Sequence, residues 1–136
     1  MPTDSTSQQN AKATRKLRIL CAEDHSMFRE VLVRLFTTGG HEVECVSDGM
    51  EAWDRMSSDL RHFDVLVTDY RMPGLNGLEL VELLKQAGYP GKIIVHAASL
   101  TEEEREKFIG FGVSQIVAKK AEAEGLLAIV EALHEI

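Results

Sequence analysis

Short apolar runs alternate along this chain with longer segments in which apolar residues recur at helical spacing, and this alternation limits the possible folds most strongly. The runs that indicate strands are residues 17–22, 42–46, 64–68, 92–96 and 114–118. The segments that indicate helices are residues 26–38, a stretch that follows Asp48, residues 77–87, a stretch from Thr101 to Gly110 or Gly112, and residues 122–135. Several runs are apolar throughout, which is typical of strands buried on both faces. The sequence therefore predicts an α/β domain of (βα)5 order, with a parallel sheet between two helical layers.

Capping residues mark where two of these helices begin. Asp48 is followed three residues later by Glu51, and Thr101 is followed at the same spacing by Glu104. An N-cap side chain with an acid three residues on is the capping-box pattern. In the first helix, the apolar spacing predicts an inward-facing stripe of Met27, Val31, Leu32 and Leu35.

Composition indicates one globular domain. The chain has 136 residues, and its 44% hydrophobic content argues against general disorder. Residues 1–15 are polar and predict a flexible tail before a domain at 16–136. The net charge of −7 argues against direct nucleic-acid binding. No apolar run approaches the ~20 residues that span a bilayer, and no signal peptide is evident, so we expect a cytoplasmic protein without membrane contact.

The cysteines and histidines show no metal-ligand spacing. Cys21 and Cys45 lie in apolar runs, which predicts buried, reduced thiols. His25 is expected to start the first helix. His96 ends an apolar strand, and we interpret it as a core histidine whose polar atoms are satisfied.

Charged side chains follow three of the predicted strands. Glu23 and Asp24 follow the first strand, Asp69 the third and Lys119 the fifth. The carboxyl ends of parallel strands meet at one edge of the sheet, where such folds bind their ligands. Clustered carboxylates repel one another unless a cation lies between them, and Mg²⁺ prefers such oxygen ligands. The pattern therefore predicts a magnesium site with a lysine suited to a phosphate oxygen.

These residues, together with Met72-Pro73 and Gly77 behind Asp69, make residues 16–136 resemble the receiver domain of bacterial two-component response regulators. The resemblance implies a flavodoxin-like three-layer fold with five parallel strands in the order 2-1-3-4-5. Only the resemblance supplies this strand order, because the hydrophobic periodicity does not determine it. Its implied function is acceptance of a phosphoryl group on Asp69 from a histidine kinase or phosphotransfer protein.

The resemblance also implies a role for each site residue. Mg²⁺ would be held by the carboxylates of Glu23, Asp24 and Asp69 and by the backbone carbonyl of Arg71. Lys119 would pair with the phosphoryl oxygens. The phosphoryl-binding loop would contain Ala97 and Ala98, and the N–H of Ala98 would contact the phosphoryl group.

Three positions depart from the family pattern. Ala97 stands where the family normally has Ser or Thr, and the hydroxyl of Ser99, two residues later, is the possible substitute. Ile116 stands where an aromatic residue is common. Lys120 replaces a common proline after the lysine, so a cis peptide is not expected there. In the family, the hydroxyl bonds the phosphoryl group and the rotamer of the aromatic ring follows it, and this pair is the usual switch. We hypothesise that the phosphorylation chemistry is retained while the usual switch is altered or absent.

These residues bear on four candidate functions. The favoured one is a stand-alone phosphoacceptor, without other enzymatic activity, that signals through contacts with a downstream protein as a monomer or weak dimer. The alternative is a pseudo-receiver that binds partners without control by phosphorylation. A haloacid dehalogenase phosphatase needs a second acid where Arg71 stands. A flavodoxin needs a phosphate-binding loop where Glu23, Asp24 and His25 stand, and these acids repel phosphate.

Overall fold

The computed structural model describes residues 15–119 and 123–134. Almost all of the predicted tail, and Lys120, therefore lie outside the described residues. The strands are β1 (Arg18–Ala22), β2 (Glu42–Val46), β3 (Val65–Thr68), β4 (Lys92–Ala97) and β5 (Gln115–Ala118). The helices are α2 (Ser26–Thr38), α3 (Gly49–Ser57), α4 (Gly77–Ala87), α5 (Glu102–Gly110) and α6 (Ala123–Leu133). None of the described helices is long and apolar enough to cross a membrane.

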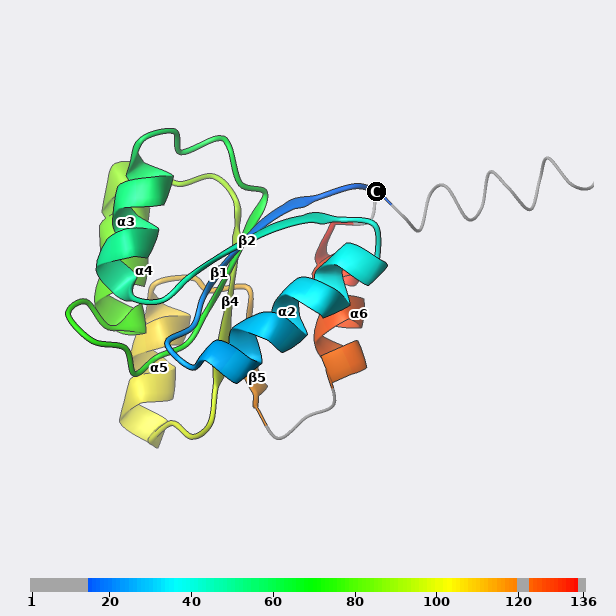
Figure 1. Ribbon diagram of the computed structural model, residues 1–136. Coiled ribbons are helices and arrows are strands. Elements are labelled where there is room, and N and C mark those ends of the chain that lie inside the picture. The colour runs from blue at the N-terminus through cyan, green and yellow to red at the C-terminus, as the bar shows by residue number, and fades with distance from the viewer. Residues whose placement is uncertain (1–14, 120–122, 135–136) are drawn as a thin grey trace, which may run out of the picture.

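The strands form one parallel sheet in the order β2-β1-β3-β4-β5. Helices α2 and α6 cover one face, and α3, α4 and α5 cover the other (Figure 1). This arrangement confirms the predicted (βα)5 sandwich and its strand order. It also brings the carboxyl ends of β1, β3, β4 and β5 to one edge of the molecule.

The central strand β3 shows why the fold is stable. All four of its residues are buried, and its three apolar residues alternate between two apolar clusters. Val65 and Val67 belong to the cluster beneath α2 and α6, whereas Leu66 belongs to the cluster beneath α3, α4 and α5. Burial on both faces explains why the sequence of this strand is a continuous apolar run.

The predicted inward stripe of α2 is partly wrong. The residues of α2 that are fully buried are Leu32 and Phe36, which lie four residues apart. Met27 and Val31 are 68% and 47% exposed, and they border a groove of about 450 Å³ that Leu127 of α6 also lines. Periodicity identified the apolar sector of the helix, but only the packing against the sheet decides which stripe of that sector is buried.

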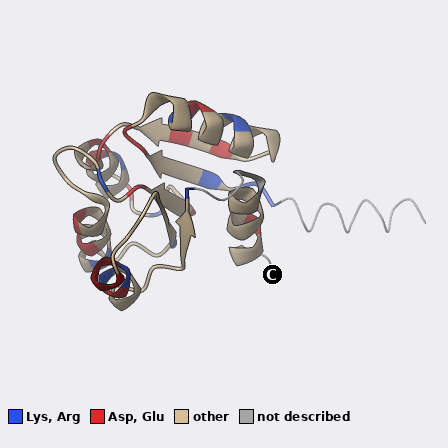
Figure 2. Cartoon of the chain, turned by 90° about the horizontal axis from the view of Figure 1, so that it is seen from below, with Lys and Arg blue, Asp and Glu red and all other residues tan. Residues whose placement is uncertain are grey.

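The predicted caps are confirmed. The Asp48 side chain accepts a hydrogen bond from the Glu51 N–H at 2.8 Å and caps α3. Thr101 and Glu104 form a reciprocal capping box at the start of α5. The three acidic residues in the first turn of α5 (red in Figure 2) therefore lie where the helix dipole favours negative charge.

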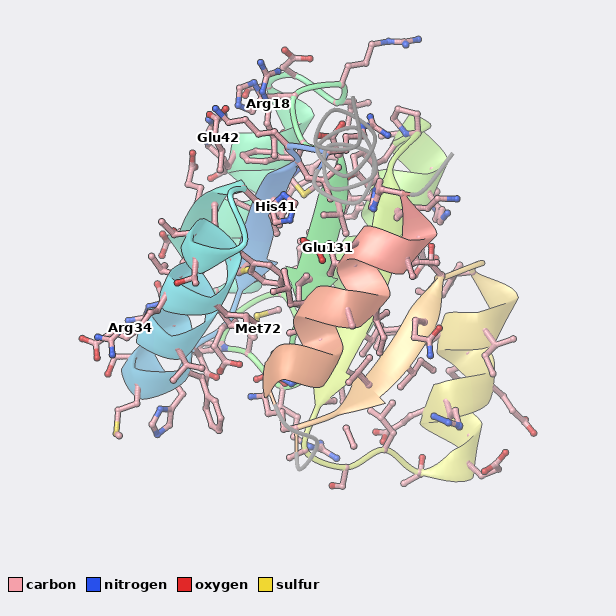
Figure 3. All side chains as sticks on the ribbon, turned by 90° about the vertical axis from the view of Figure 1, so that its right-hand side faces the viewer. Arg18, Arg34, His41, Glu42, Met72 and Glu131 are labelled. Atoms are coloured by element: carbon pink, nitrogen blue, oxygen red, sulfur yellow. The ribbon has the colours of Figure 1, made fainter. Side chains whose placement is uncertain are left out.

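A buried histidine joins α6 to the opposite edge of the sheet, at the amino ends of the strands. The Leu17 N–H donates to His41 Nδ1 at 3.1 Å, which leaves the proton on Nε2. That Nε2 lies 2.9 Å from Glu131 Oε2 of α6, and Figure 3 shows the two side chains pointing toward one another. The sequence analysis missed this contact because its partners lie 90 residues apart.

Candidate functional site

Lys119 joins two buried carboxylates at the carboxyl edge of the sheet. Its Nζ lies 2.7 Å from Glu23 Oε1 and 2.8 Å from Asp69 Oδ2. Glu23 is 1% exposed and Asp69 is 7% exposed, so water screens these ion pairs weakly. The structure thus brings together residues that the sequence places after three different strands. Glu23, Asp24, Asp69 and Lys119 are called the acid pocket below.

Asp24 supplies a third carboxylate to the acid pocket. Glu23, Asp24 and Asp69 each offer an oxygen within 4.8 Å of the others. Asp24 is exposed, so one side of the cluster faces solvent. Hard oxygen donors in this number and spacing fit the ligand preference of Mg²⁺. Beside them is an open cavity of about 410 Å³ lined by Asp24, Tyr70, Arg71, Met72, Pro73 and Asn76.

Burial and charge oppose each other in the acid pocket. Burial raises the pKa of Glu23 above its ordinary value of 4.5, although hydrogen bonds from Lys119 and from the His25 N–H act against this rise. Burial alone would lower the pKa of Lys119, but its hydrogen bonds to Asp69 and Glu23 raise it above 10.5. Lys119 is therefore a protonated cation at neutral pH.

Backbone contacts fix Asp69 at the end of β3. Its N–H donates to the Ala22 carbonyl at 2.9 Å, and its Oδ1 accepts the Tyr70 N–H at 2.7 Å. The α4 helix begins directly against this turn at Gly77. A Cβ on Gly77 would lie 2.1 Å from the Asp69 carbonyl oxygen, so this position requires glycine.

Phe28 of α2 covers the outer side of Lys119. The ammonium lies 4.7 Å from the centroid of the Phe28 ring. The His25 ring packs edge-on against Phe28 with 5.3 Å between centroids. A cation over an aromatic face is attracted by the ring electrons. The ring thus gives Lys119 a third contact in addition to its two carboxylates. The prediction that His25 starts the first helix is confirmed, because His25 is the N-cap of α2.

Tyr70 connects the residue after Asp69 to α5. Its ring packs edge-on against Phe108 with 5.6 Å between centroids. Burial, followed by the nearby Glu104 carboxylate, raises the pKa of Tyr70. Arg71 lies over the Tyr70 ring at 5.1 Å and pairs with Glu104 at 3.8 Å. We call Tyr70, Arg71, Glu104 and Phe108 the Tyr70 bridge, which the sequence analysis did not predict.

Ala97 and Ile116, which depart from the family pattern, lie on the two strands before Ala98 and Lys119. Ala97 ends β4 and is 5% exposed, and its carbonyl accepts the Lys119 N–H at 2.9 Å. Ala98 and Ser99 follow in an exposed loop. Ile116 of β5 is half-buried and packs against the cluster beneath α3, α4 and α5. A methyl group and a branched alkyl chain therefore stand where the resemblance leads us to expect a hydroxyl and an aromatic ring.

His96 differs from its prediction. It is 8% exposed, and its Nδ1 has no hydrogen-bond partner among the residues that the structure describes. Burial and the nearby Lys119 charge lower its pKa below 6.5. The expectation of a satisfied core histidine is wrong, because β4 directs this ring into a face lined mainly by apolar side chains.

Comparison with known proteins agrees with this geometry. Residues 19–131 match the family described as the response regulator receiver domain. Response regulator MprA of Mycobacterium avium is 37% identical over 117 residues, which cover 86% of this chain and 50% of MprA. Sensor protein EvgS of Escherichia coli is 29% identical over 133 residues, which cover 98% of this chain and 11% of EvgS. The chain thus spans half or less of the length of these relatives.

Solved structures show the same architecture. The N-terminal domain of an uncharacterized protein from Wolinella succinogenes superposes with a TM-score of 0.78 at 33% identity, covering 85% of this chain and 92% of that one. Chemotaxis response regulator CheY4 of Vibrio cholerae gives a TM-score of 0.78 at 24% identity, covering 88% of this chain and 99% of that one. The match over residues 19–131 identifies this chain as a member of the response regulator receiver domain family.

Proposed function

We propose that this receiver domain accepts a phosphoryl group on Asp69 and signals through contacts with other proteins. The observation that carries the proposal is the Lys119 ammonium, which bridges Glu23 and Asp69 at 2.7 and 2.8 Å. Two buried carboxylates with one cation form a site in which an added phosphoryl charge can be balanced. The donor is a phosphohistidine on a histidine kinase or phosphotransfer protein.

The residues of the acid pocket divide the chemistry between them. A carboxylate oxygen of Asp69 bonds to phosphorus while the bond from phosphorus to the histidine nitrogen breaks, and that nitrogen keeps the electron pair. Lys119 balances charge on the phosphoryl oxygens, and the Ala98 N–H contacts them beside Ala97. Glu23, Asp24, Asp69 and the Arg71 carbonyl hold Mg²⁺, which when bound stabilises the charge of the transferring group. The domain catalyses only the phosphorylation and dephosphorylation of its own Asp69 side chain.

The Tyr70 bridge supports a particular route for the signal. The Tyr70 N–H donates to Asp69 Oδ1 at 2.7 Å, while the ring of the same residue packs against Phe108 of α5. A phosphoryl group on Asp69 changes the acceptor of that N–H. We infer that the change reaches α5 through Tyr70, because Ala97 and Ile116 lack the groups of the usual switch.

The test is intact mass after incubation with acetyl phosphate and Mg²⁺. The wild-type chain is expected to gain one phosphoryl group, and the gain should be lost without Mg²⁺ and in Asp69→Asn. Asp54→Asn is the matched control, because Asp54 is an exposed carboxylate on α3. It should gain the phosphoryl group as the wild type does.

The second candidate is a pseudo-receiver that binds its partner without phosphorylation. It is favoured by Ala97 and Ile116, which stand where the family commonly has a hydroxyl and an aromatic ring. A wild-type chain that gains no mass from acetyl phosphate or from a phosphorylated phosphotransfer protein would support this candidate.

A further inference from the structure

Cys21 of β1 and Cys45 of β2 lie opposite each other in the sheet. They are Cα partners in the register of two adjacent parallel strands. Both side chains belong to the face covered by α2 and α6. Neighbouring strands lie about 4.8 Å apart. Disulfides usually join Cα atoms ~4.4–6.8 Å apart, so this register permits a bond between the two sulfur atoms.

The two thiols differ in their access to solvent. Cys21 is 0% exposed, as the sequence analysis expected. Cys45 is only half-buried, contrary to that expectation, because β2 is an edge strand of the sheet. It lines a groove of about 710 Å³ whose other walls are residues of α2. A small molecule in this groove reaches Cys45 but not Cys21.

The surroundings of the pair give the two sulfur atoms different chemistry. The Cys45 thiol lies 3.8 Å from the Arg29 backbone carbonyl, at the wall of the groove formed by α2. Interaction with Cys21, followed by the charge of the Arg29 guanidinium, lowers the pKa of Cys45 below its ordinary value. The thiolate is the nucleophilic form of cysteine. Access from the groove and this lowered pKa both make Cys45 the sulfur that an oxidant meets first.

We propose that Cys45 is an oxidation site for small peroxides and that Cys21 converts the oxidised Cys45 into a reversible cross-strand disulfide. In the first step the Cys45 sulfur bonds to one peroxide oxygen, the O–O bond breaks, and the leaving hydroxide takes a proton to form water. In the second step the Cys21 sulfur bonds to Cys45, the S–O bond breaks, and the leaving hydroxide takes the Cys21 proton. Both sulfur atoms are oxidised and both peroxide oxygens are reduced to water.

The pair adjoins the acid pocket but does not depend on its chemistry. Val46, which follows Cys45, accepts the Glu23 N–H at 3.1 Å. Oxidation of the pair needs neither Mg²⁺ nor a phosphoryl donor. Its test is therefore independent of the test of phosphorylation.

The experiment treats the reduced full-length chain with hydrogen peroxide and measures intact mass and a non-reducing peptide map. The wild type is expected to lose two hydrogen atoms, to yield a peptide pair joined through Cys21 and Cys45, and to regain its mass with dithiothreitol. Cys21→Ser should instead form a dimedone adduct on Cys45. Cys45→Ser should lose free thiol roughly tenfold more slowly than the wild type, because the remaining thiol is buried.

Two outcomes would overturn the proposal. One is a wild-type peptide map that contains oxidised Cys45 but no peptide joined to Cys21. The other is a Cys45→Ser chain that loses its thiol as fast as the wild type. The wild-type map decides the question even where a variant folds poorly, and thermal melting of each variant identifies such cases.

Discussion

The acid pocket and the Tyr70 bridge lie on either side of Asp69, but different interactions hold them together. In the acid pocket the contacts are short ion pairs between groups that are almost fully buried. In the Tyr70 bridge they are aromatic packing and an ion pair in which the Arg71 side chain is 70% exposed. Buried ion pairs are costly to break, whereas partly exposed contacts rearrange at small cost.

We infer that the two sets of contacts have different roles around the Asp69 carboxylate. The acid pocket holds Asp69 in one position for chemistry, and the Tyr70 bridge can change its contacts when Asp69 changes.

The largest effect is expected for Lys119→Met. The change leaves Glu23 and Asp69 buried without their shared cation. Removing one partner of a buried ion pair costs about 3–5 kcal/mol. The free energy of unfolding, measured by urea denaturation in EDTA, should fall by about 3 kcal/mol, with partial recovery on addition of Mg²⁺.

Lys107→Met is the matched control, because its pair with Glu103 on α5 is exposed and should contribute less than about 0.5 kcal/mol. The loss in Lys119→Met should also shrink as pH falls. The pKa of Glu23 in the folded chain already lies above its ordinary value of 4.5. As pH falls, Glu23 is therefore protonated in the folded chain before it is protonated in the unfolded chain. This protonation removes the repulsion between Glu23 and Asp69. Equal losses in the two variants would contradict the role given to the acid pocket.

The second prediction concerns Tyr70→Leu. Leucine retains apolar bulk but loses the edge contact with Phe108 and the aromatic face beneath the Arg71 guanidinium. An aromatic pair contributes about 0.5–1.5 kcal/mol and a cation over an exposed ring about 0.5–1 kcal/mol. Phosphorylation of Asp69 should persist, while the change in amide exchange that it causes in α5 should become several-fold smaller.

Ile116→Val is the control for a route through β5, the strand in which the family commonly has an aromatic residue at this position. It shortens a half-buried side chain and should leave the exchange response of α5 as in the wild type. A normal response in Tyr70→Leu together with a lost response in Ile116→Val would reverse the assignment of the route.

Local patterns were sufficient for the (βα)5 layers and for the edge that carries the acid pocket, whereas the strand order came from the family resemblance. Five apolar runs with helices between them leave little freedom in how the layers stack. Once the sheet is parallel, residues that directly follow its strands share one edge, and the strand order then makes Glu23, Asp69 and Lys119 neighbours. Strand ends are therefore the best place to seek a site in such a sequence.

The Tyr70 bridge and the cysteine pair could not be predicted in the same way. Tyr70 and Phe108 come from different elements, and their contact depends on the rotamer that packing selects. Cys21 and Cys45 face each other only because of the register between β1 and β2, which single-sequence patterns do not determine. The buried stripe of α2 was misplaced for a related reason, since its limits depend on where Phe36 meets the sheet.

The third prediction concerns His96→Leu, which replaces a buried ring whose Nδ1 has no partner within the described part of the chain with an apolar side chain. The folded pKa of His96 lies below 6.5 because of burial and the Lys119 charge, against a weaker opposing effect of Asp69. Below pH 6.5 the unfolded chain gains this proton first, so His96 lowers stability as pH falls from 6.5 toward its folded pKa. Chemical denaturation of His96→Leu at pH 7.5 and 5.5 should show a smaller loss on acidification than the wild type. A loss equal to that of the wild type would contradict the buried, neutral state of this ring.

The smallest effect is expected for Phe28→Leu. The leucine keeps apolar cover over Lys119 but removes the aromatic face that lies 4.7 Å from the ammonium. A cation over a partly exposed ring gains about 0.5–1 kcal/mol, so stability should fall by about that amount. In a double-mutant cycle with Lys119→Met, the two losses should sum to more than the loss in the double variant by the same energy.

Phe28→Tyr keeps the aromatic face and is the matched control, so its coupling to Lys119 should equal that of the wild type. Additive losses for Phe28→Leu and Lys119→Met would mean that the ring only covers the ammonium. The acid pocket would then consist of the ion pairs of Lys119 alone. A measured coupling would instead add Phe28, in the first turn of α2, to the residues that hold Lys119. This would be so although the Phe28 ring remains 38% exposed to solvent.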